Sequence, residues 1–359
     1  MPRQTVCLVI DRDAPDAAII ARAAAVLRQG GLVAFPTETV YGLGADALDA
    51  TAVAAVFTAK GRPSTDPLIV HLASTADLPR VAAAVPAIAA RLAEAFWPGP
   101  LTLIVPRGAA VPAAVTAGLA TVAVRVPAHP VAIALLRAAG VPVAAPSANR
   151  FSRPSPTAAA HVLADLDGAI DLVLDGGVTD VGVESTIVDC TVVPPVVRRS
   201  GGITIEALRG VVRDVAVLTA DASPEHAQVA PGQLLRHYAP AAPLTVYAGE
   251  PAQVVRRLAG EARTQAAAGR RVGVLAPDED LVALAPELAA IASQGRVIVA
   301  SLGKCAEPAE AAQRLFAALR WLDGETVDVI VASGPVRDGL GAAVWDRLRR
   351  AAEGRVVPV

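Results

Sequence analysis

Short runs of β-branched and aliphatic residues alternate along the chain with longer stretches rich in Ala and Leu. Runs of the first kind are typical of buried strands, and stretches of the second kind are typical of helices. In the N-terminal half, helices are predicted at 16–28, 50–58, 83–96 and 128–139. Strands are predicted there at 32–35, 68–72, 101–105, 121–126, 143–145, 172–174, 185–189 and 195–198. This alternation predicts an α/β protein.

The pattern changes after residue 213. From 218 to 243 the chain is polar and punctuated by Pro and Gly, which is typical of a linker. Beyond it a second, smaller α/β unit is predicted, with strands at 244–248, 272–275, 297–301 and 327–332 and a closing helix at 341–352. We therefore predict three parts: a domain at 1–213, a linker at 214–243 and a domain at 244–359.

Composition narrows the class of protein. A chain of 359 residues suffices for two domains that each bury a core. The formal net charge of -2 means that contact with a nucleic acid needs a local basic patch. Cys7, Cys190 and Cys305 are isolated, which argues against a disulfide framework and against a cysteine-rich zinc site. With no apolar run of membrane-spanning length, we expect a soluble, cytoplasmic protein.

Residues two apart in a strand share a face, and this rule makes Arg125 conspicuous. In the strand predicted at 121–126 the three valines face one way, and Thr121, Ala123 and Arg125 face the other. A buried arginine needs an anionic partner. That partner is either a carboxylate of the protein or the carboxylate or phosphate of a ligand, and we favour a ligand. His71 likewise interrupts an apolar strand, although a lone strand histidine is more often a satisfied core residue.

Several strands end in small hydroxyl, amide or glycine residues. These ends are at 36–44, 146–149, 183–186 and 198–202. Singly, each fits ordinary turn chemistry. Together they predict a ligand crevice at the strand ends of an open sheet, where backbone amides can approach phosphate oxygens. Lys60, Arg62, Arg198 and Arg199 can neutralise those oxygens, although no Walker-type loop is present.

Lys60 is one of only two lysines among the 32 Lys and Arg residues of the chain. An ammonium is a compact point charge, whereas a guanidinium is a planar fork, so the two are not interchangeable. Rarity alone leaves two interpretations open: a solvated residue in a turn, or a cation at a site. The other lysine, Lys304, lies in the second unit and is assigned no role.

Seven motifs occur in an order that resembles the YrdC family. They are PTETVYGLG (36–44), KGRP (60–63), PLIVH (67–71), FWPGPLT (96–102), RVP (125–127), PSAN (146–149) and ESTIVD (184–189). The family's Lys-x-Arg signature corresponds to Lys60 and Arg62, and its Ser-x-Asn signature to Ser147 and Asn149. The segments 231–240 and 339–348 resemble the longer, two-domain threonylcarbamoyl-AMP synthases. This resemblance implies an N-terminal YrdC-like twisted open mixed sheet with helices, followed by a smaller C-terminal Rossmann-like α/β domain.

The activity implied by the resemblance joins L-threonine, bicarbonate and ATP, with magnesium, into threonylcarbamoyladenylate, pyrophosphate and water. A separate threonylcarbamoyl transferase then modifies tRNAs that read codons beginning with A, and direct contact with tRNA is left open. Lys60 and Arg62 are the implied catalytic residues. The implied threonine pocket consists of Thr39, His71, Arg125, Ala145 and Ser185. The implied ATP pocket consists of Arg62, Asp66, Thr121, Ser147, Asn149, Ser155, Arg199 and Tyr238.

One residue departs from the family pattern: many members carry Asn where this chain has Asp66. The proposed mechanism needs concentrated positive charge, because a carbamate must attack the α-phosphate of ATP. Lys60 is our candidate for bridging these two anions, with Arg62 and Arg199 on the polyphosphate. The linker with Tyr238 is a candidate lid, and the sequence indicates no general base.

Two other classes of function stay open. An RNA-binding module would use the same basic residues, but no stacking aromatic residues are interleaved with them. A carbamoyl-transfer enzyme, akin to the YrdC-like domain of hydrogenase-maturation proteins, would carry cysteine-paired zinc segments that this chain lacks. The C-terminal domain shows no phosphate loop and no credible catalytic set, so regulation, lid control and partner docking are all compatible with it.

Overall fold

The computed structural model describes residues 4–218, 221 and 225–359, and the chain divides into two compact units. The first unit runs to Phe151 and continues over Ser155–Leu234. The second contains Leu235–Val359 and, in addition, the short loop Ser152–Pro154. The segment predicted as a linker is thus divided: its residues up to Leu234 belong to the first unit, and those from Leu235 onward belong to the second. Its residues 219–220 and 222–224 lie outside the described residues.

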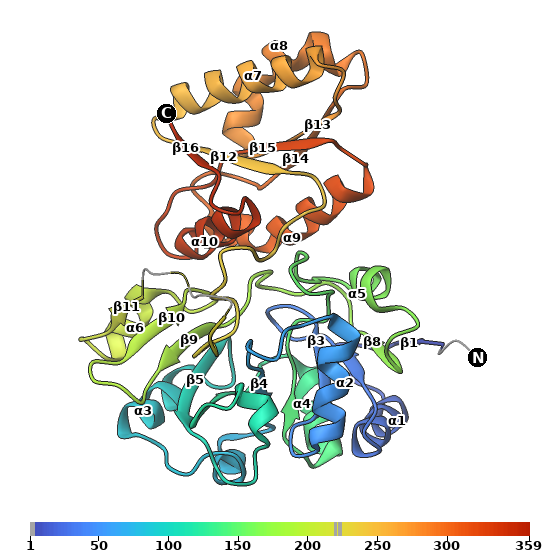
Figure 1. The fold of residues 1–359 in the computed structure, drawn as a ribbon, viewed down its shortest axis with the longest axis vertical. Helices are drawn as coiled ribbons and strands as arrows, with labels where there is room; N and C mark the ends of the chain where they lie inside the picture. The colour runs from blue at the N-terminus through green and yellow to red at the C-terminus, as the bar shows by residue number, and fades with distance from the viewer. Residues whose placement is uncertain (1–3, 219–220, 222–224) are drawn as a thin grey trace. The chain divides into compact units, whose positions relative to one another are not determined.

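The first unit is built on a mixed sheet of eleven strands in the order β1-β8-β2-β3-β7-β4-β6-β5-β9-β10-β11 (Figure 1). The strands are β1 (Val6–Val9), β2 (Val33–Phe35), β3 (Gly42–Asp46), β4 (Ile69–His71), β5 (Leu101–Pro106), β6 (Thr121–Arg125), β7 (Val143–Ala144), β8 (Leu172–Asp175), β9 (Thr186–Asp189), β10 (Val196–Arg199) and β11 (Ala216–Val217). Parallel pairs such as β4 with β6 stand beside antiparallel pairs such as β5 with β6. The predicted open mixed sheet is therefore confirmed.

Six α-helices and two short 3-10 helices accompany this sheet in the described residues. They are α1 (Ala17–Arg28), α2 (Ala50–Lys60), α3 (Ala87–Phe96), α4 (Pro130–Ala139), α5 (Ala159–Leu166), α6 (Ile205–Val211), η1 (Thr75–Arg80) and η2 (Ala113–Thr116). Two predicted helix starts are wrong by a few residues. The helices begin at Ala87 and Pro130 because Pro86 occupies the cap of α3 and Pro130 the first turn of α4, positions that suit a residue without an amide hydrogen.

The two faces of this sheet are covered differently. On one face, Ile20, Leu27, Val131 and Leu135 of α1 and α4 pack against residues of β2, β7 and β8. Next to them on the same face, apolar residues of β4, β5, β6 and β9 pack instead against Ala230 and Val229. The opposite face carries the large core that includes Val122 and Val124. The predicted alternation in β6 is confirmed, since Ala123 lies in the small cluster with Ala230.

The stretch PTETVYGLG was predicted as the polar end of a strand at the crevice, but its last residues begin a strand of their own. Gly42–Asp46 forms strand β3, which pairs antiparallel with β2. A Cβ on Gly44 would lie 2.8 Å from Phe35 Cε1 and 2.8 Å from Val143 Cγ1. The absence of a side chain at Gly44 therefore serves close packing between strands.

The second unit is a parallel sheet of five strands in the order β14-β13-β15-β12-β16. The strands are β12 (Leu244–Ala248), β13 (Val272–Ala276), β14 (Val297–Ser301), β15 (Val329–Ala332) and β16 (Val356–Pro358). The helices are α7 (Pro251–Ala267), α8 (Asp278–Ala292), α9 (Pro308–Gly324) and α10 (Gly341–Ala351). This topology confirms the predicted smaller α/β domain. Among the helices of the described chain, none has both the length and the apolar character needed to cross a membrane.

Candidate functional site

Lys60 is the last residue of α2, and its side chain points into the protein. Gly61 follows it with a φ of 62°, in the left-handed region that ends helices and that glycine adopts readily. The ammonium Nζ donates to the carbonyl oxygens of Ser147 at 2.5 Å and Asn149 at 2.6 Å. Lys60 is only 3% exposed. The interpretation of Lys60 as a solvated turn residue is therefore wrong, and the Lys-x-Arg and Ser-x-Asn signatures are in direct contact.

Arg62 and Asp66 form a buried ion pair beside Lys60. The Nη2 of Arg62 lies 2.9 Å from Asp66 Oδ1, and the guanidinium also donates to the carbonyl oxygens of Asp66 and Pro67. Asp66 is fully buried. Burial raises the pKa of the Asp66 carboxyl, and the charges of Arg62, Lys60 and Arg199 act in the opposite direction. Asp66 is thus a counter-charge among three cations.

Arg199 lies at the end of β10 and contacts two other segments. Its Nε and Nη2 donate to the carbonyl oxygen of Ser185 at 3.2 and 3.1 Å, and its Nη1 donates to the carbonyl oxygen of Pro231 at 3.3 Å. The Ser185 hydroxyl in turn shares a 2.8 Å hydrogen bond with the Thr102 hydroxyl. Arg198 is used differently, because it pairs with Asp189 at 2.7 Å.

Arg125 has a protein carboxylate as its partner. Its Nη2 lies 2.6 Å from Glu38 Oε1, its Nη1 donates to the Thr39 hydroxyl at 2.9 Å, and its Nε donates to the carbonyl oxygen of Gly99 at 3.2 Å. Of the two partners considered for Arg125, the carboxylate of the protein is observed, and the additional carboxylate or phosphate of a ligand stays a prediction. Glu38 was missed although it precedes Thr39 directly in the PTET stretch, and that adjacency was the available signal.

His71 is the neighbour of Arg125 across the parallel pair β4 and β6, where the two residues are Cα partners. Its ring meets Phe35 edge to face at a centroid distance of 6.3 Å. Burial, and then the charge of Arg125, lower the pKa of His71 to about 3. The imidazole is therefore neutral at pH 7 and presents hydrogen-bonding nitrogens without adding charge.

Three further predicted residues lie in the first unit at strand starts and ends. Ala145 directly follows β7 and donates its amide to the Ile69 carbonyl oxygen at 2.9 Å. Thr121 opens β6 and is partly exposed. The Ser155 hydroxyl is fully buried and donates to Glu184 Oε1 at 2.5 Å, which identifies Glu184 as a second carboxylate that sequence reasoning missed.

Part of the predicted linker lies on the same sheet face as Arg125. The amide of Gln228 donates to the Thr65 carbonyl oxygen at 2.9 Å, beside Asp66. Ala230 is fully buried against the small apolar cluster of the sheet, and Pro231 accepts from Arg199. Tyr238, in contrast, belongs to the second unit, where its ring packs on Phe316 at a centroid distance of 5.2 Å.

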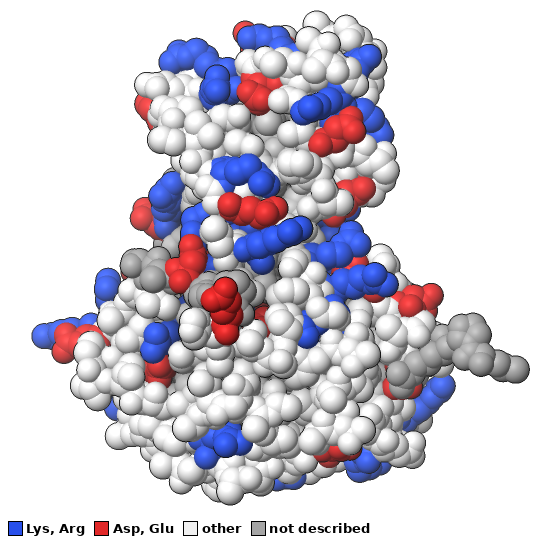
Figure 2. Space-filling view, viewed as in Figure 1, with Lys and Arg blue, Asp and Glu red and all other residues white. Residues whose placement is uncertain are grey.

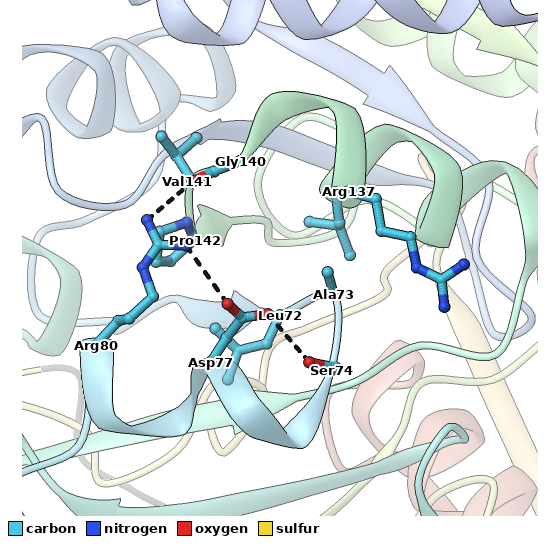
Figure 3. A pocket seen from close by; sticks show the side chains of 10 residues that line it. Leu72, Ala73, Ser74, Asp77, Arg80, Arg137, Gly140, Val141 and Pro142 are labelled. Atoms are coloured by element: carbon cyan, nitrogen blue, oxygen red, sulfur yellow. Dashed lines mark hydrogen bonds and ion pairs between the residues drawn. The ribbon is translucent and has the colours of Figure 1, made fainter.

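A separate cavity of about 280 Å³ lies in the first unit, beyond the end of β4 (Figure 3). Arg80 and Asp77 line it, 3.5 Å apart, and Arg80 also donates to the Gly140 carbonyl oxygen. No residue of the predicted site is among those that line this cavity. The buried cations Lys60, Arg62 and Arg199, with Ser147, Asn149 and Ser185, therefore remain the candidate site.

Comparison with known proteins agrees with the motifs. A family model described as "Telomere recombination" matches residues 25–201, and one described as "Threonylcarbamoyl-AMP synthase, C-terminal domain" matches residues 203–353. Threonylcarbamoyl-AMP synthases from Pyrococcus abyssi and Bacillus subtilis are each 44% identical over 339 residues, which is 94% of this chain and 95% and 94% of theirs. The crystal structure of P. abyssi Sua5 complexed with L-threonine is similar with a TM-score of 0.89 and 42% identity, over 99% of this chain and 100% of that one. The resemblance to the YrdC family is confirmed, and this chain belongs to the two-domain threonylcarbamoyl-AMP synthase family.

Proposed function

We propose that this protein is a nucleotidyltransferase that makes L-threonylcarbamoyladenylate from L-threonine, bicarbonate and ATP, releasing pyrophosphate and water. The observation that carries the proposal is the buried contact of Lys60 with the Ser147–Asn149 turn, beside Arg62 and Arg199. Relatives with 44% identity over 94% of the chain carry the name of this activity. The solved relative with bound L-threonine supports an amino-acid substrate.

Threonine would bind beside Arg125. The guanidinium offers a charged fork for the α-carboxylate, which would share it with Glu38 and Thr39. Neutral His71 and the hydroxyls of Thr39 and Ser185 suit the threonine hydroxyl, because they can donate or accept hydrogen bonds without charge. Ala145 would form an apolar wall of this pocket.

ATP would bind at the cation cluster. Lys60, Arg62 and Arg199 are each less than 10% exposed, so their charges act in a partly dry environment. Such preorganised cations stabilise the charge that develops when a carbamate attacks the α-phosphorus and pyrophosphate leaves. Holding the reactants in line supplies further acceleration. The hydroxyls and amide of Thr121, Ser147, Asn149 and Ser155 would contact the nucleotide.

Asp66 fits a positioning role better than a direct contact with ATP. Its carboxylate is fully buried and ion-paired with Arg62. A carboxylate there keeps three cations together without facing the phosphates. An Asn at this position in related proteins would keep the shape and polarity of the side chain while it changes the local charge.

Magnesium is proposed as the companion of ATP. Mg²⁺ is usually bound through substrate phosphates and one or two carboxylates. Asp66 is the carboxylate beside the cation cluster, and its ion pair with Arg62 makes it a poor metal ligand. In residues 4–218, 221 and 225–359, no group of three or more His, Cys, Asp or Glu side chains that would hold a metal is found. The ion would neutralise phosphate charge.

The product would be the substrate of a transferase that modifies tRNA. This role does not require the protein itself to bind tRNA. On the face shown in Figure 2, arginines and carboxylates are interspersed. A small-molecule site therefore accounts better for the buried cations than an RNA-binding surface does, since buried side chains cannot reach a phosphate backbone. No observation favours the carbamoyl-transfer alternative.

Measurement of pyrophosphate release tests the proposal. With ATP and magnesium present, release should require both L-threonine and bicarbonate, and the nucleotide product should be a threonylcarbamoyl adenylate by mass spectrometry. Release that is indifferent to threonine would exclude this function. RNA binding that falls steeply with salt, in the absence of any such turnover, would support the RNA-binding module instead.

A further inference from the structure

One face of helix α9 holds two short segments that come from far apart in the sequence. Phe316, Arg320 and Asp323 follow one another at spacings of four and three residues, so they lie on the same side of the helix. The segments are the loop Ser152–Pro154 and the stretch 235–241, both part of the second unit. We propose that Asp323 is a positioning residue through which the C-terminal unit fixes the ATP-binding residues, an inference that rests on the proposed function.

The loop Ser152–Pro154 is bound at three points. The Ser152 carbonyl oxygen accepts from the Ala239 amide at 2.7 Å, Arg153 lies 3.4 Å from Asp323, and the Pro154 carbonyl oxygen accepts from Arg320 at 2.5 Å. The backbone of Ser152 is in the left-handed region, with a φ of 69°. A residue other than glycine keeps this conformation only where its surroundings hold it. The loop is therefore a fastened part of the C-terminal unit.

The stretch 235–241 is fastened to the same helix. The ring of Tyr238 lies between Phe316, at a centroid distance of 5.2 Å, and the guanidinium of Arg347, 5.5 Å from the ring centre. Arg347 is fully buried, and Tyr238 has a φ of 61°. These contacts fix the ring as well as the backbone. Tyr238 is thus held by the C-terminal unit, whichever ligand it meets.

Asp323 joins the two segments through one carboxylate. Its Oδ1 accepts from the Ala241 amide at 2.8 Å, and its Oδ2 faces Arg153. The side chain is only 7% exposed. Removal of this carboxylate takes away the acceptor of the Ala241 amide and the charge that faces Arg153, which loosens both segments.

Both segments continue directly into residues of the candidate site. Ser155 follows Pro154, and Asn149, whose carbonyl oxygen accepts from Lys60, precedes Ser152 by three residues. Pro231, which accepts from Arg199, precedes Leu235 by four residues. Because at most four residues separate these groups from the fastened segments, at most about 15 Å of chain, we expect movement of the segments to reach them. Thr39, His71 and Arg125, which belong to the proposed threonine pocket, are distant in sequence from both fastened segments.

The test compares three variants by steady-state kinetics and by direct ATP binding. Asp323→Ala should raise the KM and the dissociation constant for ATP roughly tenfold, while the KM for threonine changes by less than about twofold. Asp323→Asn, which keeps an acceptor for the Ala241 amide, should recover most of the affinity. Glu325→Ala is the matched control, because Glu325 follows the same helix and its carboxylate pairs with Arg271 at the surface.

Two outcomes would overturn the inference. The first is an unchanged ATP affinity in Asp323→Ala. The second is an equal loss of affinity for ATP and threonine together with a lowered melting temperature, which is the signature of a general structural role. If Asp323→Ala does not fold, Arg153→Ala decides the matter: a weakened ATP affinity with unchanged threonine affinity supports the inference, and an unchanged ATP affinity overturns it. ATP binding is measured without turnover. The result therefore tests the role of Asp323 even if the wild-type protein does not catalyse the proposed reaction.

Discussion

The two lysines of this chain show how differently its two units use charge. Lys60 in the first unit is buried and donates to two backbone carbonyl oxygens. Lys304 in the second unit has a side chain that is 63% exposed and pairs with Glu307 at 2.9 Å. The same ammonium is thus a fixed internal donor in one region and a solvated surface charge in the other. Burial and the identity of the partners, rather than rarity, distinguish a site residue from a surface residue.

The sharpest test of this difference replaces each lysine by arginine. Lys60→Arg keeps the positive charge but puts a planar fork where a compact ammonium meets two carbonyl oxygens. We expect kcat to fall about a thousandfold, in the range seen when a preorganised donor is lost at a reaction centre. Lys304→Arg should change kcat by less than about twofold, because exposed charges contribute little.

The rate of pyrophosphate release gives kcat for both variants, and their melting temperatures show whether they fold. Near wild-type turnover in a folded Lys60→Arg protein would show that the ammonium is not needed.

Arginines of the two units extend the comparison. Arg125→Lys removes the fork that meets Glu38 and Thr39, so we expect kcat/KM for threonine to fall about a hundredfold. The dissociation constant for ATP should change little. Arg263→Lys is the exposed counterpart, since Arg263 pairs with Glu287 at the surface.

Calorimetric titration with threonine and with ATP separates the two effects. Equal weakening of both ligands in Arg125→Lys would contradict the separate threonine pocket.

The buried histidine gives the first unit a pH dependence. Burial lowers the pKa of His71 to about 3, below the value near 6.5 of an unfolded histidine. Between these values the unfolded chain binds a proton that the folded protein does not, so the free energy of unfolding rises with pH. We expect the first unit to lose about 2 kcal/mol between pH 7 and pH 5 from this residue.

Urea unfolding of wild type and His71→Asn at several pH values measures this slope. His71→Asn should flatten it, and an unchanged slope would assign the pH dependence to other groups.

The smallest effect is expected at the exposed pair of the second unit. Glu307→Gln removes the partner of Lys304, and we expect the free energy of unfolding to change by less than about 0.5 kcal/mol. Denaturant unfolding measures it. A loss of about 2 kcal/mol would mean that the surface pair is structurally coupled and that the contrast between the units is weaker than burial indicates.

Much of the fold follows from local pattern. Twelve of the sixteen strands and five of the ten α-helices in the described residues lie within a few residues of predicted positions, because β-branched runs and Ala/Leu stretches have strong local preferences. β3 was missed because its sequence, Gly-Leu-Gly-Ala-Asp, has low strand propensity and becomes a strand only by pairing with β2. β1, β11, β16, α5 and α6 were also missed, and each is short, with between two and eight residues.

The residues of the candidate site were predicted from the sequence, but the hydrogen bonds and ion pairs between them were not. Motif order indicates that Lys60, Ser147 and Asn149 act together. It does not indicate that the lysine reaches the carbonyl oxygens of the other two, because backbone acceptors leave no trace in sequence. The pairing of Arg125 with Glu38 and the division of the linker at Leu234 depend likewise on tertiary packing.

The register of β4 and β6 has a consequence for how this protein can change. His71 and Arg125 are opposite each other in a parallel pair, so the geometry of the proposed threonine pocket depends on the alignment of these two strands. A shift of one residue in either strand would turn that strand's side chain, His71 or Arg125, to the opposite face. Changes of length in the loops that connect these strands would leave this alignment in place. Grafting experiments should treat β4 and β6 as one inseparable unit.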